Sequence, residues 1–193
     1  MTDKKRILIG VTGSVDITLL PSCLKTIKSR IDCQLTVIMT PQATSFIAPE
    51  TLRLFADRVI AGDRPVDWPT DKPSKIVDDH DVLAVMPATA NTLAAVAQGS
   101  APNRLTTVIL AANFPVIFFP VMGAVMWKKP AVVRNVEQIR ADGYEVIEPV
   151  WHENYDAALQ KIVGHPSLPD NETIVKILQE RLKRQVLMTG QAG

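Results

Sequence analysis

The sequence predicts an α/β fold in which helices cover both faces of a central parallel sheet. Two observations predict it: short, almost wholly apolar runs recur along the chain, and segments with helical spacing of apolar residues separate them. Such runs are typical of strands buried on both faces, and their alternation with helices is typical of parallel strands. A chain of 193 residues suits one domain, so we expect residues 1–193 to form a single unit.

The first half of the chain contains two strand and helix units. They are the strand Arg6–Val11 with a helix over residues 17–27, and the strand Gln34–Met39 with a helical segment over residues 43–57. Pro21 is compatible with the first helix only near its first turn, because a proline inside a helix removes a hydrogen bond and clashes with the preceding turn.

The second half continues the alternation. Val82–Met86 and Pro115–Phe119 are β-branched, apolar runs that each close on a proline, and we expect both to be central parallel strands. Pro130 suits a first helical position and Gly143 suits a helix C-terminus, so a helix is expected between them. Tyr144–Ile147 is the last strand that the pattern predicts.

The C-terminal region divides into two parts. Trp151–Asp170 has weak periodicity and several loop formers, so we expect a loop-like substrate flap rather than part of the core. Asn171–Met188 carries apolar residues on one helical face, and Asp170 is a suitable N-cap for it. Residues 189–193 are expected to form a frayed tail.

Composition excludes several classes of protein. A net charge of +1 argues against the basic surface of a nucleic-acid binder. Cys23 and Cys33 provide neither a disulfide framework nor metal-ligand spacing, so no metal site is expected. The N-terminus lacks the apolar segment of a signal peptide, and apolar stretches end well short of the roughly 20 residues that a membrane span needs. We therefore expect a cytoplasmic protein without membrane contact.

The predicted strand ends carry residues suited to a ligand. Thr12-Gly13-Ser14 follows the first strand, where free backbone N–H groups at a helix start can hold a phosphate, although such a turn also occurs without a ligand. The glycines do not complete a dinucleotide fingerprint. Thr40 after the second strand can meet the same ligand or simply start a helix. Phe46 can add a ring beside the ligand or pack in the core.

Two later segments are more informative. Asn91 and Thr92 lie where a helix follows a central strand, and helix capping accounts for only one of them. Their amide and hydroxyl groups suit a flat heterocycle with alternating donors and acceptors, such as a flavin ring. Pro120–Trp127 brings two methionines and a tryptophan to another strand end. This segment suits either adaptable core packing or a soft wall for a sulfur-containing substrate.

These segments resemble the motifs of a known family. Residues 87–92, Pro-Ala-Thr-Ala-Asn-Thr, resemble its P-A-S-A-N-T motif, and residues 120–127 resemble its P-x-M-N-x-x-M-W motif. Residues 12–15, 40–46 and 99–105 match its remaining turns in order and spacing. Over about residues 5–150 the chain therefore resembles the homo-oligomeric flavin-containing cysteine decarboxylases.

The resemblance implies a flavodoxin-like, Rossmann-like three-layer sandwich. It also implies trimers that build the flavin site at their interface, and usually a dodecamer. The implied cofactor is FMN, with FAD left open. The implied flavin contacts are Gly13, Ser14, Val15, Thr40, Phe46, Ala90, Asn91, Thr92 and Met122. The implied substrate contacts are Gly123, Met126 and Trp127.

Two positions depart from the family pattern. The catalytic histidine of the family falls on Pro73, and the asparagine that contacts the substrate carboxylate falls on Gly123, so no catalytic residue is assigned. His80 is expected to be an exposed residue at a helix end. His152 and His165 can reach the site only if the flap folds over it.

The cysteine count separates branches within the resemblance. Coenzyme A pathway enzymes that decarboxylate phosphopantothenoylcysteine carry a reducing cysteine in a flap after the last strand, and this chain has none after Cys33. It thus resembles the peptidyl-cysteine decarboxylases of lanthipeptide, linaridin and thioamitide biosynthesis. These oxidatively decarboxylate the C-terminal cysteine of a ribosomally made precursor peptide to an enethiol.

Three alternatives stay open. The first is a catalytically silent, flavin-binding regulatory subunit, which the departures at Pro73 and Gly123 favour and the retained Met and Trp residues disfavour. The others are a phosphopantothenoylcysteine decarboxylase and a flavin prenyltransferase.

Overall fold

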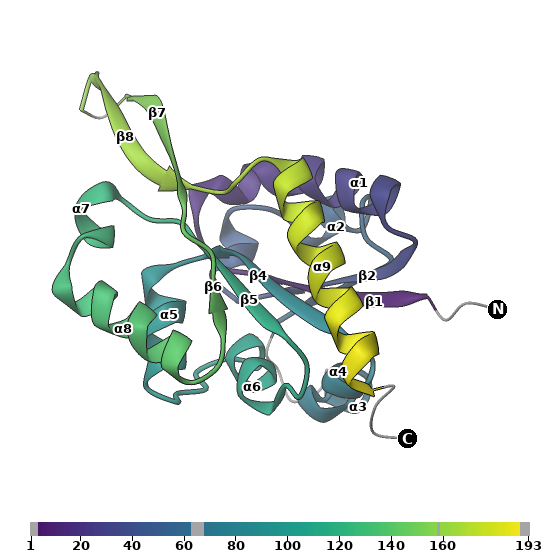
Figure 1. Cartoon of the computed structure of the whole chain (residues 1–193). Coiled ribbons are helices and arrows are strands. Elements are labelled where there is room, and N and C mark those ends of the chain that lie inside the picture. The colour runs from purple at the N-terminus through teal and green to yellow at the C-terminus, as the bar shows by residue number, and fades with distance from the viewer. Residues whose placement is uncertain (1–3, 63–67, 158, 190–193) are drawn as a thin grey trace.

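A six-stranded parallel sheet forms the centre of the computed structural model, which describes residues 4–62, 68–157 and 159–189 (Figure 1). Its strand order is β3-β2-β1-β4-β5-β6. The strands are β1 (Lys5–Val11), β2 (Cys33–Met39), β3 (Arg58–Ala61), β4 (Val82–Ala88), β5 (Val116–Pro120) and β6 (Glu145–Val146). The order reverses between β1 and β4, and sheets of this kind bind ligands beyond their carboxyl ends at such a reversal.

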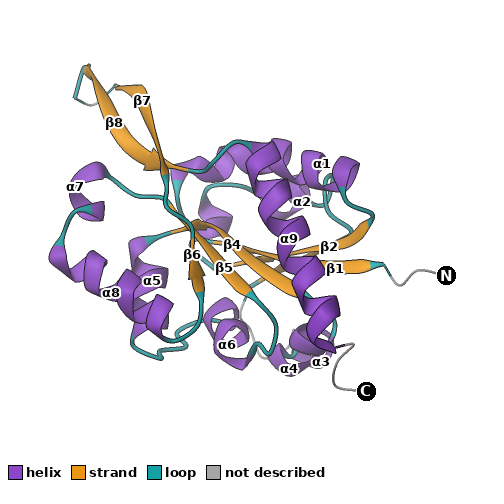
Figure 2. Cartoon of the chain, in the orientation of Figure 1, coloured by secondary structure: helices purple, strands orange, loops and turns teal. Residues whose placement is uncertain are grey.

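Helices cover both faces of this sheet, which confirms the predicted three-layer α/β fold (Figure 2). One face packs against η1 (Val15–Leu19), α1 (Leu20–Arg30), η2 (Ala43–Ser45), α2 (Pro49–Leu52) and α9 (Asn171–Thr189). The other face packs against α4 (Pro73–Asp78), α5 (Ala90–Ala97), α6 (Arg104–Ala111) and α8 (Pro130–Ala141). Two short helices, α3 (Trp68–Asp71) and α7 (Ala124–Trp127), precede α4 and α8.

Alternation along the strands supplies side chains to both faces. In β1, Ile7 and Ile9 point into one core and Leu8 points into the other, and all three are fully buried. Ile9 lies opposite Val37 of β2 and Ala84 of β4. The central strands thus bury apolar side chains above and below the sheet, as the continuous apolar runs predict.

The second predicted helix is wrong in its extent. Residues 43–57 form two short helices, η2 and α2, rather than one continuous helix. Pro49 starts α2, because a proline lacks the N–H that a continuing helix requires. The next strand, β3, has only four residues and pairs only with β2 at the edge of the sheet, so its pattern was too short to predict.

The prediction of a loop-like segment over residues 151–170 is also wrong. This segment contains an antiparallel hairpin of β7 (Val150–Asp156) and β8 (Lys161–Ser167), which projects beyond the carboxyl edge of the sheet (Figure 1). Trp151, Tyr155 and Ile162 remain exposed on the hairpin. Since neither face of the hairpin packs on a core along its length, its sequence lacks the apolar alternation of a half-buried strand.

The last helix begins as predicted. The backbone N–H of Thr173 donates to Asp170 Oδ1 at 2.9 Å, which confirms Asp170 as the N-cap of α9. Arg30 Nη2 of α1 lies 3.0 Å from Glu172 Oε1 of α9. Ile174, also in α9, is fully buried. Of the predicted tail, residue 189 ends α9 and residues 190–193 lie outside the described residues. Within the described part of the chain, no helix is long and apolar enough to cross a membrane.

Candidate functional site

The turns after β1 and β4 meet at the reversal of strand order, where Thr12 joins them. The Thr12 hydroxyl donates to Pro87 O at 2.7 Å and accepts from the backbone N–H of Thr89 at 3.1 Å. Thr12 is only 1% exposed. Both bonds are shielded from water, so they hold the two turns in a defined relation.

The turn after β2 packs directly against the turn after β1. A Cβ atom at Gly13 would lie 2.4 Å from Gln42 Cγ, so a larger residue would push the two turns apart. Thr40 donates its backbone N–H to Val11 O at 3.0 Å, and its hydroxyl accepts from Ala43 N at 3.2 Å. Glycine at position 13 is therefore needed for the close approach, and Thr40 is a buried part of the same junction.

The start of α5 is capped by Thr89, not by Asn91 or Thr92. Thr92 donates its backbone N–H to the Thr89 hydroxyl at 3.4 Å, and the two hydroxyl oxygens lie 3.2 Å apart. Thr92 is buried, whereas Asn91 is exposed in the first turn. The expectation that capping occupies one of these two residues is wrong, because Thr89 stands at the N-cap position.

A cavity of about 800 Å³ lies between the turn after β1, the segment from β5 into α7, and the hairpin. The residues that line it are Ser14, Val15, Asp16, Val121, Met122, Gly123, Ala124, Val125, Met126, Tyr155, Asp156, Leu159, Lys161, Ile162, Val163, Gly164 and His165. It contains three predicted flavin contacts and two predicted substrate contacts. These are Ser14, Val15, Met122, Gly123 and Met126.

The other predicted site residues lie outside this lining. They are Gly13, Thr40, Phe46, Ala90, Asn91, Thr92 and Trp127. Trp127 borders a separate hollow of about 220 Å³ beside α8. Phe46 is 46% exposed, so its interpretation as a core residue is wrong. The predicted flavin contacts therefore extend from the cavity along the junction of the three turns.

Asp16 and Ser167 are site residues that sequence analysis missed. The Ser167 hydroxyl donates to Asp16 Oδ2 at 2.6 Å, and both residues are buried. This bond ties the end of β8 to η1 across 151 positions of sequence. A carboxylate among apolar residues at a helix start could have marked Asp16 as a site residue. Nothing in the sequence indicates that Ser167 is its partner.

The junction has donors and walls that suit a flavin. Among the described residues, no backbone acceptor takes the N–H groups of Gly13, Ser14 or Val15 at the start of η1. Free N–H groups at a helix start suit a phosphate, and the Met122 and Met126 side chains provide apolar wall for a ring. The residues present therefore fit the phosphate and the ring system of a flavin.

The chain's three histidines lie in different environments. His80 is buried and its Nδ1 lies 2.6 Å from Ile76 O, so the expectation of an exposed histidine is wrong. Burial lowers the pKa of His80. His152 is exposed on β7, directly opposite His165 of β8. Only His165 lines the cavity.

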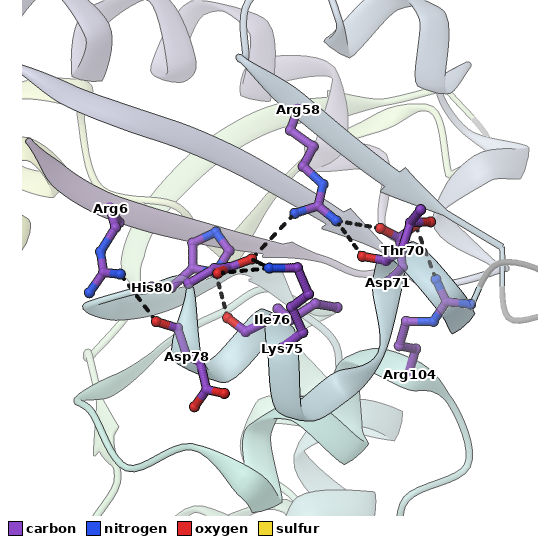
Figure 3. Close-up of polar contacts among 10 residues, drawn as sticks. Arg6, Arg58, Thr70, Asp71, Lys75, Ile76, Asp78, His80 and Arg104 are labelled. Atoms are coloured by element: carbon purple, nitrogen blue, oxygen red, sulfur yellow. Dashed lines mark hydrogen bonds and ion pairs between the residues drawn. The ribbon is translucent and has the colours of Figure 1, made fainter.

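Pro73 starts α4. Figure 3 shows a cluster of charged side chains that includes Arg58, Asp71 and Arg104. Arg58 of β3 pairs with Asp71, and Arg104 Nη1 lies 3.6 Å from Asp71 Oδ2. The Arg104 side chain is only 2% exposed. These contacts anchor Asp71, two residues before Pro73, to β3 and α6. Pro73 does not line the cavity.

Comparison with known proteins gives the same assignment as the geometry. The chain is 38% identical over 146 residues to mersacidin decarboxylase of Bacillus sp. (strain HIL-Y85/54728), covering 76% of this chain and 74% of the relative. It is 26% identical to epidermin decarboxylase of Staphylococcus epidermidis, covering 93% and 97%. It is 33% identical to the coenzyme A biosynthesis bifunctional protein CoaBC of Bacillus subtilis (strain 168), covering 96% of this chain and 45% of that protein.

Solved structures show the same fold. The crystal structure of SpaF, an FMN-dependent cysteine decarboxylase, superposes with a TM-score of 0.77 at 31% identity, covering 94% of this chain and 97% of SpaF. The family model named Flavoprotein matches residues 1–183, which include the sheet, the three turns and the hairpin. With this match, the chain belongs to the Flavoprotein family.

Proposed function

We propose that this chain is a flavin-dependent decarboxylase that oxidises the C-terminal cysteine of a ribosomally made peptide and releases an enethiol. The observation that carries the proposal is the cavity bounded by Ser14, Met122 and Met126, in a family member related to mersacidin and epidermin decarboxylases. Ser14 of the turn after β1 and the two methionines line the same space, and residues of the hairpin border it.

Flavin binding follows from the junction. The N–H groups of Gly13, Ser14 and Val15 hold the phosphate, and Thr40, Phe46, Ala90, Asn91, Thr92 and Met122 surround the remainder of the molecule. FMN is the proposed form, since SpaF is FMN-dependent. When bound, the flavin supplies a two-electron acceptor for the hydride that leaves Cβ of the substrate cysteine.

The chain itself orients the substrate and excludes water. Gly123 leaves open space beside the methionines, since a Cβ atom there would meet only Met126 Sδ, at 4.0 Å. The thioether of Met126 gives the substrate sulfur a polarisable neighbour. Trp127, at the end of α7, borders the separate hollow beside α8 and not this wall. The hairpin closes the opposite side, and we propose that it is the substrate flap. Closure of this kind removes water from around the reacting groups.

The thiols of this chain cannot reduce the product. Cys23 and Cys33 are both buried in the core around α1 and β2, and neither lines the cavity. Burial raises the pKa of Cys23 to about 12 and that of Cys33 to about 11, so both remain protonated thiols. Without a thiol in the cavity to reduce it, the enethiol leaves as the product. This supports a peptide reaction over decarboxylation of phosphopantothenoylcysteine.

We also propose a homo-oligomer, a trimer that further assembles into a dodecamer, acting in the cytoplasm. Val15 and Val125 line the cavity yet are 68% and 71% exposed. Apolar side chains at the mouth of a site gain stability when another copy of the chain covers them. Free cysteines agree with a reducing compartment.

The test measures carbon dioxide release by the purified, FMN-loaded protein from synthetic peptides that end in cysteine. Peptides that end in serine are the matched control, because they lack only the oxidisable sulfur. We expect release from the cysteine peptides alone, with an enethiol product about 46 Da lighter by mass spectrometry, the mass of carbon dioxide and two hydrogen atoms. Flavin binding without any release, also from the cognate precursor, would replace this proposal with a regulatory flavin-binding subunit. Release from phosphopantothenoylcysteine alone would instead assign the coenzyme A reaction.

A further inference from the structure

We propose that His165 of the hairpin is the catalytic base that takes the proton from the substrate thiol. The inference rests on the proposed function and supplies the proton acceptor that the family pattern leaves missing at Pro73. His165 lines the cavity together with Gly123 and Met126, so the hairpin brings an imidazole to the place where the substrate sulfur is expected. His80 and His152 do not line this cavity.

The other ionisable groups of the cavity are less suited to this role. The Asp16 carboxylate is buried and accepts the Ser167 hydroxyl at 2.6 Å, which commits it to anchoring the hairpin. Asp156 accepts the backbone N–H of Leu159 at 2.9 Å and shapes the tip of the hairpin. An ammonium group such as that of Lys161 has donors and no acceptor. Histidine is the side chain whose neutral form accepts protons near pH 7.

One contact of the His165 ring bears on which nitrogen carries its proton. Nδ1 of His165 lies 3.2 Å from Pro166 O. A carbonyl oxygen only accepts, so Nδ1 carries the proton of the neutral ring and the lone pair is on Nε2.

The proton and electron balance is complete. The sulfur–hydrogen bond of the substrate breaks, and its proton moves to Nε2 of His165. The Cβ–H bond breaks and its hydrogen leaves as a hydride while the carbon–sulfur double bond forms, and a flavin held at the junction would supply the two-electron acceptor for it. The Cα–carboxylate bond then breaks, carbon dioxide leaves, and its electron pair forms the Cα=Cβ bond with the charge on sulfur. That sulfur recovers the proton from His165 to give the enethiol.

The test compares His165→Gln and His165→Gly with His152→Gln in the full-length, FMN-loaded protein. Glutamine keeps a side-chain donor for Pro166 O but offers no basic nitrogen. General-base catalysis is worth about 10²–10⁴-fold, so we expect His165→Gln to lose about 100-fold in kcat/KM on a peptide ending in cysteine. We expect His152→Gln to stay within about threefold of the wild type. Free imidazole should restore part of the rate to His165→Gly and none to the wild type, an effect that a structural role would not produce.

Two measurements separate the possible failures. The flavin absorption spectrum reports whether each variant still holds FMN, and fluorescence anisotropy of a labelled peptide reports binding without turnover. Wild-type rates in His165→Gln, with FMN and peptide bound, would overturn the role of His165 and leave the proposed function intact. A wild-type protein that binds both yet releases no carbon dioxide would overturn both proposals. Loss of rate without imidazole rescue would reassign His165 to a positioning role.

Discussion

Gly123 stands where the resemblance implies an asparagine, and the structure has room for that side chain. It is the N-cap of α7, with φ −62° and ψ 144°, a conformation that asparagine adopts readily at helix starts. A Cβ atom there has no neighbour closer than 4.0 Å. The cavity has therefore not closed around the glycine, although sequence alone left that open.

We expect Gly123→Asn to fold normally and to bind the substrate carboxylate more tightly. A hydrogen bond to a charged group contributes about 1.5–3 kcal/mol, so KM should fall about tenfold. Steady-state kinetics of carbon dioxide release measure this change. Gly99→Asn is the control, because Gly99 is exposed with φ +63°, a conformation that asparagine tolerates, far from the cavity lining. An unchanged KM in Gly123→Asn would show that the carboxylate is held elsewhere.

His80 makes stability depend on pH. Burial lowers its pKa, so the folded chain binds fewer protons than the unfolded chain just below the ordinary histidine pKa of about 6.5. Stability is thus fully present above that value and is lost as pH falls toward the folded pKa, by at most about 1.4 kcal/mol per pH unit. Urea unfolding between about pH 5 and 7.5 measures the slope.

The variant that removes this dependence is His80→Asn, whose amide can still donate to Ile76 O. We expect a flatter stability profile for His80→Asn, and the wild-type profile for His152→Gln, because His152 is exposed. Parallel profiles in the wild type and His80→Asn would mean that other groups produce the acid sensitivity.

Sequence analysis identified residues well where a motif met a strand end and poorly where burial depended on partners distant in sequence. Ser14, Val15 and Gly123, predicted as ligand contacts, all line the cavity. His80 was misjudged because its charged neighbours in sequence suggest exposure, while in the fold it is only 5% exposed and its ring contacts Ile76 O. Asp16 was missed because its partner Ser167 lies at the far end of the chain.

Among the elements, the hairpin β7–β8 stands apart from the central sheet. Its strands pair only with each other, and its base is tied down by the bond from Ser167 to Asp16. A buried bond to a carboxylate is costly to break, because the charge is left without its donor. The mobility of the hairpin is therefore set mainly at its base.

We expect the amides of β7 and β8 to exchange with solvent faster than those of the central sheet, and to become protected when peptide binds. Ser167→Ala should raise their exchange without peptide by about tenfold and weaken peptide binding, because Asp16 loses its donor. Hydrogen exchange followed by mass spectrometry measures both effects. Ser22→Ala is the control, since Ser22 is exposed on α1. Equal protection with and without peptide would argue against a substrate flap.

The sequence predicted correctly those elements that a single local feature of the chain specifies. Buried apolar runs predicted β1, β2, β4 and β5, and proline and glycine predicted the ends of α8. The apolar residues over 43–57 predicted one continuous helical segment, but Pro49 divides it into two short helices. The strands of the hairpin pair with each other away from the core, so burial left no pattern from which to predict them.

For the whole molecule, the exposed apolar side chains around the cavity predict association. Light scattering at micromolar concentration should give at least three times the 21.2 kDa mass of one chain. Dilution that dissociates the assembly should release flavin, because Val15 and Val125 then face water at the site. A monomer that retains flavin would contradict both the proposed trimer and the proposal that the trimer interface covers the flavin site.

The arrangement of the hairpin also bears on how such a protein can change over time. Ile147 N donates to Phe118 O at 2.9 Å before the hairpin, and Leu168 is buried after it, so both ends of the insertion are anchored to the sandwich. Val150–Asp156 and Lys161–Ser167 form their ladder with each other. Selection for a new peptide can thus vary the hairpin around His165 while folding and cofactor retention stay with the sheet. Grafting hairpins between related decarboxylases, with His165 kept, should transfer peptide preference in the same way.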